Sequence, residues 1–223
     1  MPTTTRTLSE HDSVRLVARH GVPVVTIRQV ADADEAVSAA AEIGGPVVVK
    51  LHGDAIAHKT ERGLVRLRLT SAQAVRTAAS ELLAAATPGD GPVDLVVAPM
   101  LSGTRELVAG MLVDPQFGPC VMIGVGGVLT EALGDVAFRL VPITRADADD
   151  MLDELTHQAL LGPVRGEPAV DRSAVADVLL ALSALAGSEP DVVSVDLNPL
   201  VIVGGRPIAV DALVETTASE VTA

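Results

Sequence analysis

Three oxygen-bearing side chains near the C-terminus are spaced so that a hairpin would bring them together. Two strand patterns, residues 192–203 and 207–210, flank Gly204-Gly205, and a two-residue turn there pairs residues whose numbers sum to 409. This register sets Asn198 opposite Asp211, with Cβ atoms roughly 4.5–5.5 Å apart, and Asp196 shares a face with Asn198. Such a set suits a hard cation such as Mg²⁺; the alternative is three solvated groups at a strand end.

A cluster of cations stands out in this acidic chain between residues 50 and 68. It comprises Lys50, Lys59, Arg62, Arg66 and Arg68. Lys50 ends a Val-rich strand pattern, where a lysine is rarely placed without an anionic partner; the alternative is a side chain that extends to solvent. We interpret Lys50 and Lys59 as phosphate contacts, and the alternating Arg66 and Arg68 as a solvated strand face.

Small residues and one histidine extend the phosphate interpretation. Gly53 would let backbone N–H groups approach an anion. His58 is a candidate phosphoryl acceptor because imidazole is a competent nucleophile, whereas a histidine without companions in a loop is more often an ordinary surface residue. Gly126 and Gly127 follow another strand pattern, so they either hold a phosphate or form a plain turn.

The elements expected to carry these residues alternate between strands and amphipathic helices. Strands are predicted at residues 22–27, 46–51, 65–69, 93–98, 106–113, 120–125, 137–141, 192–203 and 207–210. Helices are predicted near the N-terminus and at residues 34–43, 75–86, 147–160 and 171–186. Turn formers at residues 87–92 predict a boundary between two α/β lobes, residues 1–90 and residues 91–223, the second with the metal-binding hairpin. A cleft between two lobes is a usual ligand site.

Composition excludes several classes of function. The 223 residues carry a formal net charge of −13, which disfavours nucleic-acid and membrane-surface binding. Two Phe, no Tyr and no Trp leave no platform on which bases could stack. One cysteine, Cys120, cannot form an internal disulfide, and the N-terminus has no signal-peptide pattern. We therefore expect a cytoplasmic protein.

Six motifs in a fixed order resemble a known family. They are His58-Lys59-Thr60-Glu61-Arg62-Gly63, Gly103-Thr104-Arg105-Glu106-Leu107, Asp114-Pro115-Gln116-Phe117-Gly118-Pro119, Gly124-Val125-Gly126-Gly127, Phe138-Arg139-Leu140 and Asp196-Leu197-Asn198-Pro199-Leu200. Together they resemble the ATP-grasp domain of the NDP-forming acyl-CoA synthetases, which include the ADP-forming acetate–CoA ligases and are distant relatives of the succinyl-CoA synthetase β subunit. The resemblance covers residues 8–214, nearly the whole chain.

The resemblance implies an ATP-grasp fold with MgATP between two α+β lobes. It implies that Lys50 contacts ATP phosphate, that Glu106 lies near the ribose, and that Asn198 and Asp211 hold Mg²⁺. His58, with Lys59 beside it, would relay the phosphoryl group. The further nucleotide contacts implied are Gly53, Val97, Met100, Gly126 and Gly127. The family reaction converts ATP, a carboxylate and CoA to acyl-CoA, ADP and phosphate through an acyl phosphate and a phosphohistidine.

Departures from the family pattern leave other functions open. Leu64 follows Gly63 where many relatives have a second glycine, and the expected adenine segment, residues 97–100, lacks the Gln or Glu that relatives often carry. A chain of 223 residues has no room for a CoA-binding domain. We therefore expect either a subunit that works with an α-type, CoA-binding partner in a hetero-oligomer, or a domain excised from a fused protein. The alternatives are a different ATP-grasp ligase, one that joins a carboxylate to an amine, and a non-catalytic nucleotide-sensing subunit.

Overall fold

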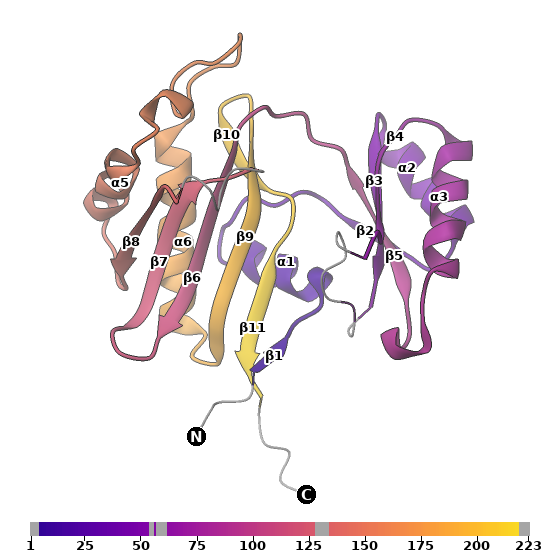
Figure 1. Cartoon of the computed structure of the whole chain (residues 1–223), viewed down its shortest axis with the longest axis horizontal. Coiled ribbons are helices and arrows are strands. Elements are labelled where there is room, and N and C mark those ends of the chain that lie inside the picture. The colour runs from indigo at the N-terminus through magenta and orange to yellow at the C-terminus, as the bar shows by residue number, and fades with distance from the viewer. Residues whose placement is uncertain (1–4, 54–55, 57–61, 128–133, 219–223) are drawn as a thin grey trace, which may run out of the picture. The chain divides into compact units, whose positions relative to one another are not determined.

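The chain forms two units, each with its own sheet (Figure 1). The computed structural model describes residues 5–53, 56, 62–127 and 134–218. Residues 25–101 make up the smaller unit, whereas the larger unit combines the chain up to residue 24 with everything from residue 102. The larger unit therefore includes both ends of the described chain.

The smaller unit is a four-stranded antiparallel sheet covered on one side by two helices (Figure 1). Its strand order is β2-β5-β3-β4, from β2 (Arg28–Val30), β3 (Val47–His52), β4 (Val65–Leu69) and β5 (Asp94–Pro99). The helices are α2 (Ala33–Ile43) and α3 (Ala72–Ala84), and a short 3-10 turn, η1 (Pro88–Asp90), precedes β5. Apolar residues of the sheet and both helices, among them Leu51, Leu82 and Leu95, form its buried core.

The larger unit is built on a seven-stranded antiparallel sheet. Its order is β1-β11-β9-β6-β7-β8, and β10 pairs with part of β9. The strands are β1 (Thr5–Thr7), β6 (Glu106–Asp114), β7 (Gly118–Val125), β8 (Val136–Leu140), β9 (Val192–Val203), β10 (Arg206–Ala209) and β11 (Leu213–Thr217). The helices are α1 (Glu10–Arg19), α5 (Arg145–Glu154) and α6 (Arg172–Ser188), and η2 (Gln158–Leu160) is a 3-10 turn.

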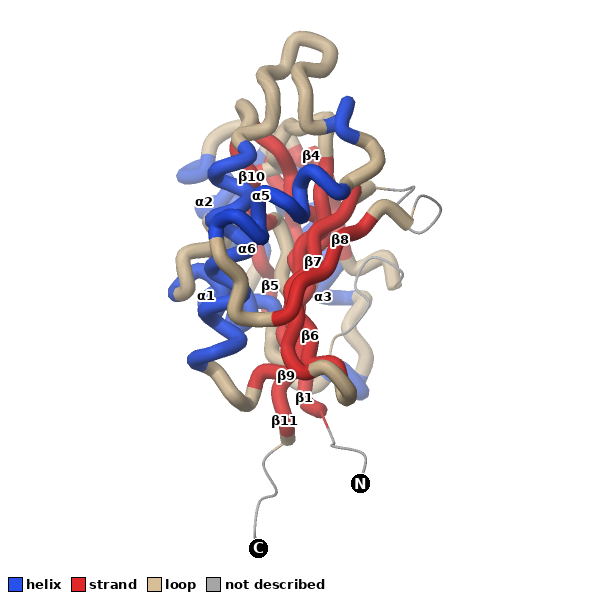
Figure 2. The backbone as a smooth tube through the Cα atoms, turned by 90° about the vertical axis from the view of Figure 1, so that its left-hand side faces the viewer, coloured by secondary structure: helices blue, strands red, loops and turns tan. Residues whose placement is uncertain are grey.

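The three helices of the larger unit lie on one side of its strands (Figure 2). Helix α6 packs on β6 and β7, α5 on β8, and α1 on β11. Alternate residues of the strands, such as Met111, Ile123 and Leu197, are almost fully buried under these helices. The opposite sheet face carries the remaining residues of each strand, and no described helix of this unit covers it. No described helix is long and apolar enough to span a bilayer.

The division of the chain differs from the predicted boundary at residue 90. Strand β5, at residues 94–99, pairs with both β2 and β3, so these hydrogen bonds keep it in the smaller unit. The N-terminal helix α1 packs against β11 near the other end of the sequence, and β1 pairs with β11 as well. The strand predicted at residues 22–27 was wrong: only Val24 makes an isolated bridge, and β2 begins at Arg28.

Candidate functional site

Glu106 and two predicted glycines meet where β6 begins. The Gly126 N–H donates a hydrogen bond of 2.8 Å to the Glu106 carbonyl oxygen. A Cβ atom added at Gly126 would lie 2.8 Å from the carbonyl carbon and oxygen of Leu107, so only glycine fits there. Gly127 has a φ of +92°, and a Cβ atom added there would lie 3.5 Å from the Glu106 carboxylate. The backbone after β7 therefore comes close to this carboxylate.

The predicted hairpin register is confirmed on both sides of the proposed metal ligands. Strands β9 and β10 pair Val203 with Arg206 through to Leu200 with Ala209, a sum of 409 each time. Strand β11 continues the same sum, because Leu213 pairs with Asp196. Asn198 and Asp211 occupy the interval between these two ladders, so the register places them opposite each other.

The electrostatics of this interval favour a cation. Asp196 and Asn198 are exposed, whereas their neighbours Val195 and Leu197 are buried, so the two polar side chains share a face. Partial shielding from water, followed by the nearby Asp211 charge, raises the pKa of Asp196. The two carboxylates thus repel each other, and a bound cation would relieve this repulsion.

The donor set fits Mg²⁺ only if other ligands complete its shell. In the described part of the chain, no three His, Cys, Asp or Glu side chains gather as a metal site. An amide oxygen from Asn198 and a carboxylate from Asp211 leave most of an octahedral shell to be filled. Mg²⁺ commonly binds through one or two carboxylates plus waters and substrate phosphates. The pair therefore suits Mg²⁺ that arrives with a nucleotide.

Glu106 lies on the same open face as Asp196. The pairing of β6 with β7 is regular from Leu107 to Asp114, and the register shift between β6 and β9 at Leu107–Ala109 places its extra residue on β9. The alternation along β6 therefore puts Glu106 on the same face as Gly110, four positions away. Gly110 pairs directly with Asp196 on β9. The Glu106 and Asp196 carboxylates thus project from the sheet face opposite the helices.

The predicted nucleotide contacts of the smaller unit occupy different environments. Lys50 is half-buried on β3, between Val65 on β4 and Val96 on β5. Met100 follows β5 and is also half-buried, and its N–H donates a hydrogen bond to the Pro46 carbonyl oxygen. These two residues retain exposed surface that a ligand can reach.

Two other predicted contacts of the smaller unit are packed against protein. Val97 is fully buried in the core and pairs with Arg28 and Val49, so its side chain supports the sheet and offers no surface to a ligand. Gly53 follows β3, and a Cβ atom added there would lie 3.0 Å from the Pro92 carbonyl oxygen. Its glycine is therefore also required for packing.

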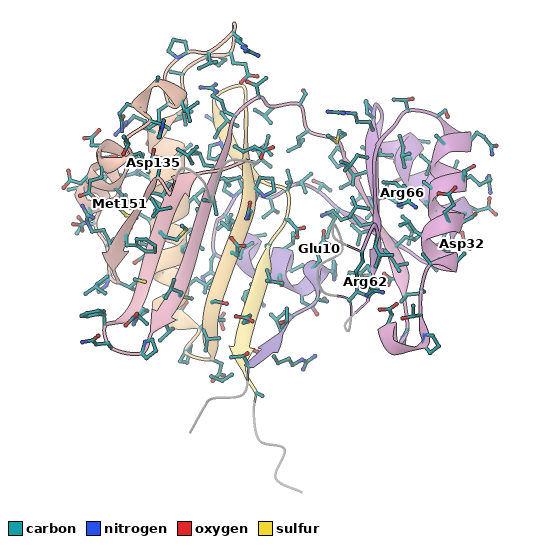
Figure 3. All side chains as sticks on the ribbon, viewed as in Figure 1. Glu10, Asp32, Arg62, Arg66, Asp135 and Met151 are labelled. Carbon is teal, nitrogen blue, oxygen red and sulfur yellow. The ribbon has the colours of Figure 1, made fainter. Side chains whose placement is uncertain are left out.

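His58 and Lys59 lie outside the described residues, but the chain on either side of them is held by side-chain hydrogen bonds. On one side, His52 Nδ1 lies 2.7 Å from Asp94 Oδ1, and the histidine is only 5% exposed. On the other side, Arg62 (Figure 3) donates two hydrogen bonds, of 2.7 and 2.9 Å, to Asp90. These bonds, with others from Thr87, hold the pKa of Asp90 well below its usual range.

The Arg62 pair changes the interpretation of the basic cluster. Because the Asp90 carboxylate accepts both hydrogen bonds of the Arg62 guanidinium, it neutralises the positive charge of Arg62 within the protein. Sequence reasoning missed the pair, since only a tertiary contact joins residues 28 positions apart. It also missed Arg105, which is 5% exposed and donates to the carbonyl oxygens of Leu160, Gly162 and Pro168. Arg105 lines a cavity of about 90 Å³ with Glu106 and Gly126.

Comparisons with known proteins agree with this geometry. A family model described as an ATP-grasp domain matches residues 2–216. The β subunit of the ADP-forming acetate–CoA ligase I of Pyrococcus furiosus is 36% identical over 210 residues, which cover 93% of this chain and 90% of that subunit. In Archaeoglobus fulgidus, an ADP-forming acetate–CoA ligase is 36% identical over 85% of this chain, but the match covers only 28% of that longer protein.

Solved structures extend the similarity to the backbone. The dinucleotide-forming acetyl-coenzyme A synthetase 1 of Ca. Korarchaeum cryptofilum, with coenzyme A and Ca-AMPCP, superposes with a TM-score of 0.88 at 32% identity. The match covers 95% of this chain and 93% of that one. A second structure of that protein, with Mg-AMPPCP and a phosphohistidine segment that points towards the nucleotide site, gives a TM-score of 0.82 at 34% identity and the same coverage. The chain therefore belongs to the ATP-grasp family and, within it, to the group formed by the β subunits of the ADP-forming acetate–CoA ligases and their fused counterparts.

Proposed function

We propose that this chain is the ATP-binding subunit of an ADP-forming acid–CoA ligase. The enzyme converts ATP, a carboxylate and CoA to acyl-CoA, ADP and phosphate. One observation carries the proposal: the chain matches a β subunit of this enzyme class over nine-tenths of both sequences. The sheet face with Glu106, Asp196 and the Asn198–Asp211 pair supports it, because this face offers oxygen ligands and a backbone that glycines keep close to a carboxylate.

The residues of the larger unit bind the metal ion and the ribose of the nucleotide. Asn198 and Asp211 hold Mg²⁺, which neutralises phosphate charge when it is bound. Glu106 accepts hydrogen bonds from the ribose hydroxyl groups, and the small size of Gly126 and Gly127 keeps the chain after β7 close to the Glu106 carboxylate. Most of the catalysis then comes from position and electrostatics, as is usual for phosphoryl transfer.

The residues of the smaller unit act on the phosphate groups. Lys50 and Lys59 neutralise phosphate charge, while Gly53 and Met100 add contacts to the nucleotide. A ring nitrogen of His58 attacks the γ-phosphorus of ATP, so an N–P bond forms, the bond to the β,γ-bridging oxygen breaks, and ADP leaves. His58 then passes the phosphoryl group to a histidine of the partner. The side-chain hydrogen bonds of His52 and Arg62 fix the chain on both sides of His58.

The partner is an α-type subunit that binds CoA and carries the second phosphohistidine. Two findings support this: relatives of the same length are named β subunits, and fused relatives are more than three times as long as the matched region. In the synthetase of Ca. Korarchaeum cryptofilum, a phosphohistidine segment points towards the nucleotide site. The hetero-oligomer, and not the isolated chain, is then the active ligase.

Calorimetric titration with ATP, with and without Mg²⁺, tests the nucleotide site. The wild-type chain should bind ATP in a Mg²⁺-dependent manner, and Asp211→Ala should lose that dependence. Asp150→Ala, which removes an exposed carboxylate from α5, is the matched control and should behave as wild type. Normal Mg²⁺-dependent binding by Asp211→Ala would overturn the metal assignment. If the wild-type chain and its complex with the α-type subunit both failed to bind ATP, the proposed function would be refuted.

A further inference from the structure

The open face of the large sheet carries a group of exposed apolar side chains. Five of them are between 37 and 55% exposed: Leu112 on β6, Val136, Phe138 and Leu140 on β8, and Leu213 on β11. We call this group the apolar sheet face. Exposed apolar side chains that gather on one face of a protein can mark a site of association.

The strand register shows that these side chains project from one face. Residues that pair across neighbouring strands form rows on this face. One row consists of Leu140 on β8, Cys120 on β7 and Leu112 on β6. The next row on the same face consists of Phe138 on β8, Met122 on β7, Gly110 on β6, Asp196 on β9 and Leu213 on β11. The residues between the two rows, such as Val121 and Met111, are buried under the helices.

Aromatic content makes this end of the unit unusual. The chain has two Phe, no Tyr and no Trp. Both are exposed: Phe138 is 47% exposed on β8, and Phe117 is 65% exposed in the turn between β6 and β7. Phenylalanine is enriched in the buried centres of protein interfaces, so two exposed copies in a chain with none in its core point to association.

Strand β8 is also an unprotected edge of the sheet. It pairs with β7 on one side and with no described strand on the other. Charged side chains usually protect such edges, but the one arginine of β8, Arg139, forms an ion pair with Glu154 on α5. The edge and the apolar sheet face are therefore both open to a partner.

We infer that the apolar sheet face is the docking surface for the α-type, CoA-binding subunit, an inference that rests on the proposed function. The relatives indicate that this fold works with a further polypeptide, either as a subunit or fused in one chain. Met122 lies two strands away from Asp196 in the same row, which is about 10 Å at the usual strand spacing. A subunit docked here therefore borders the phosphate end of the nucleotide site, where a phosphoryl group must be transferred.

The surroundings define the chemistry of the partner surface. Asp196 lies between Gly110 and Leu213 in its row, Glu215 follows Leu213 by two positions on β11, and the chain carries a net charge of −13. Both carboxylates therefore border the apolar side chains. Complementary potentials raise association rates and select partners. The docking surface of the α-type subunit should therefore have an apolar centre and a basic rim.

Two charge insertions test the location. Phe138→Glu and Leu140→Glu place a carboxylate in the apolar sheet face, and Leu67→Glu is the matched control, because Leu67 is 57% exposed on β4 of the other unit. Each variant is mixed with the α-type subunit that gives acetate- and CoA-dependent ADP release with the wild-type chain. Sedimentation velocity measures association, titration with MgATP measures the nucleotide site, and circular dichroism confirms folding.

The outcomes separate the docking surface from the proposed function. We expect both face variants to bind the α-type subunit at least tenfold more weakly, with MgATP affinity retained, whereas Leu67→Glu matches wild type. Wild-type association of the face variants would overturn the inference and leave the ATP-binding role intact. A wild-type chain that forms a homodimer, which Phe138→Glu dissociates, would also overturn it, because a second copy would then occupy the face.

Discussion

A single methyl group at Gly126 should separate β6 from β7 where Glu106 enters the sheet. In Gly126→Ala, the new Cβ atom would lie 2.8 Å from the Leu107 carbonyl, whereas ordinary contacts of a Cβ atom begin at 3.4 Å. Both neighbours are backbone atoms, which cannot rotate out of the way. The strands must therefore move apart by about 0.6 Å, which stretches the 2.8 Å hydrogen bond from Gly126 beyond the normal range of about 2.7–3.2 Å.

The cost follows from overpacking and from the weakened hydrogen bond. Overpacking of a well-packed site costs about 1–3 kcal/mol. Loss of a backbone hydrogen bond costs about 1 kcal/mol. We expect the free energy of unfolding of the larger unit to fall by about 2–4 kcal/mol, which lowers the melting temperature by about 4–16 °C for a chain of this length. Affinity for MgATP should fall as well, because Glu106 moves with its strand.

Circular dichroism melting and calorimetric titration measure the two effects. Gly187→Ala is the control: it adds a methyl group in α6 where no heavy atom lies within 4 Å. Since glycine disfavours a helix, this variant should gain about 0.5–1 kcal/mol and bind MgATP as wild type does. If Gly126→Ala melted and bound MgATP like the wild type, the close approach of β6 and β7 at Glu106 would be disproved.

Two further predictions concern a strained residue and a buried carboxylate. Arg68 has a φ of +56°, a backbone conformation that only glycine adopts without strain. Arg68→Gly should therefore be more stable than Arg68→Ala by about 1 kcal/mol in urea unfolding. Equal stabilities of the two variants would contradict this. Burial acts to raise the pKa of Asp135 (Figure 3), but hydrogen bonds from the Thr156 and His157 N–H groups and the His157 ring outweigh it and lower the pKa. This stabilisation is present above about pH 4 and is lost as the pH falls through the lowered pKa of Asp135. The free energy of unfolding of Asp135→Asn should therefore decrease less than that of the wild type when the pH is lowered. The same decrease in both proteins would refute the assignment.

The C-terminal hairpin shows what local sequence can determine. Turn chemistry at Gly204-Gly205 and a side-chain period of two are properties of neighbouring residues, so counting outward from the turn predicted the pairing of β9 with β10. The same count predicts that Asn198 lies opposite Asp211, and the pairing on both sides of this interval agrees with it. The ordered motifs, from the His58 segment to the Asp196 segment, likewise identified the family without any knowledge of contacts.

Only the tertiary structure decided which distant segments share a unit and a face. Strand β5 belongs with β3, Arg62 pairs with Asp90, and Glu106 projects from the same face as Asp196, because hydrogen bonds and packing join residues far apart in sequence. Val97 was predicted to contact the nucleotide, but its strand is central in the smaller sheet and its side chain is buried. A hydrophobic period shows that one face of a strand is buried, but it does not show which element covers that face. The helices cover one side of the large sheet and leave Phe138 and Leu140 exposed on the other, and this arrangement depends on long-range packing that no local pattern contains.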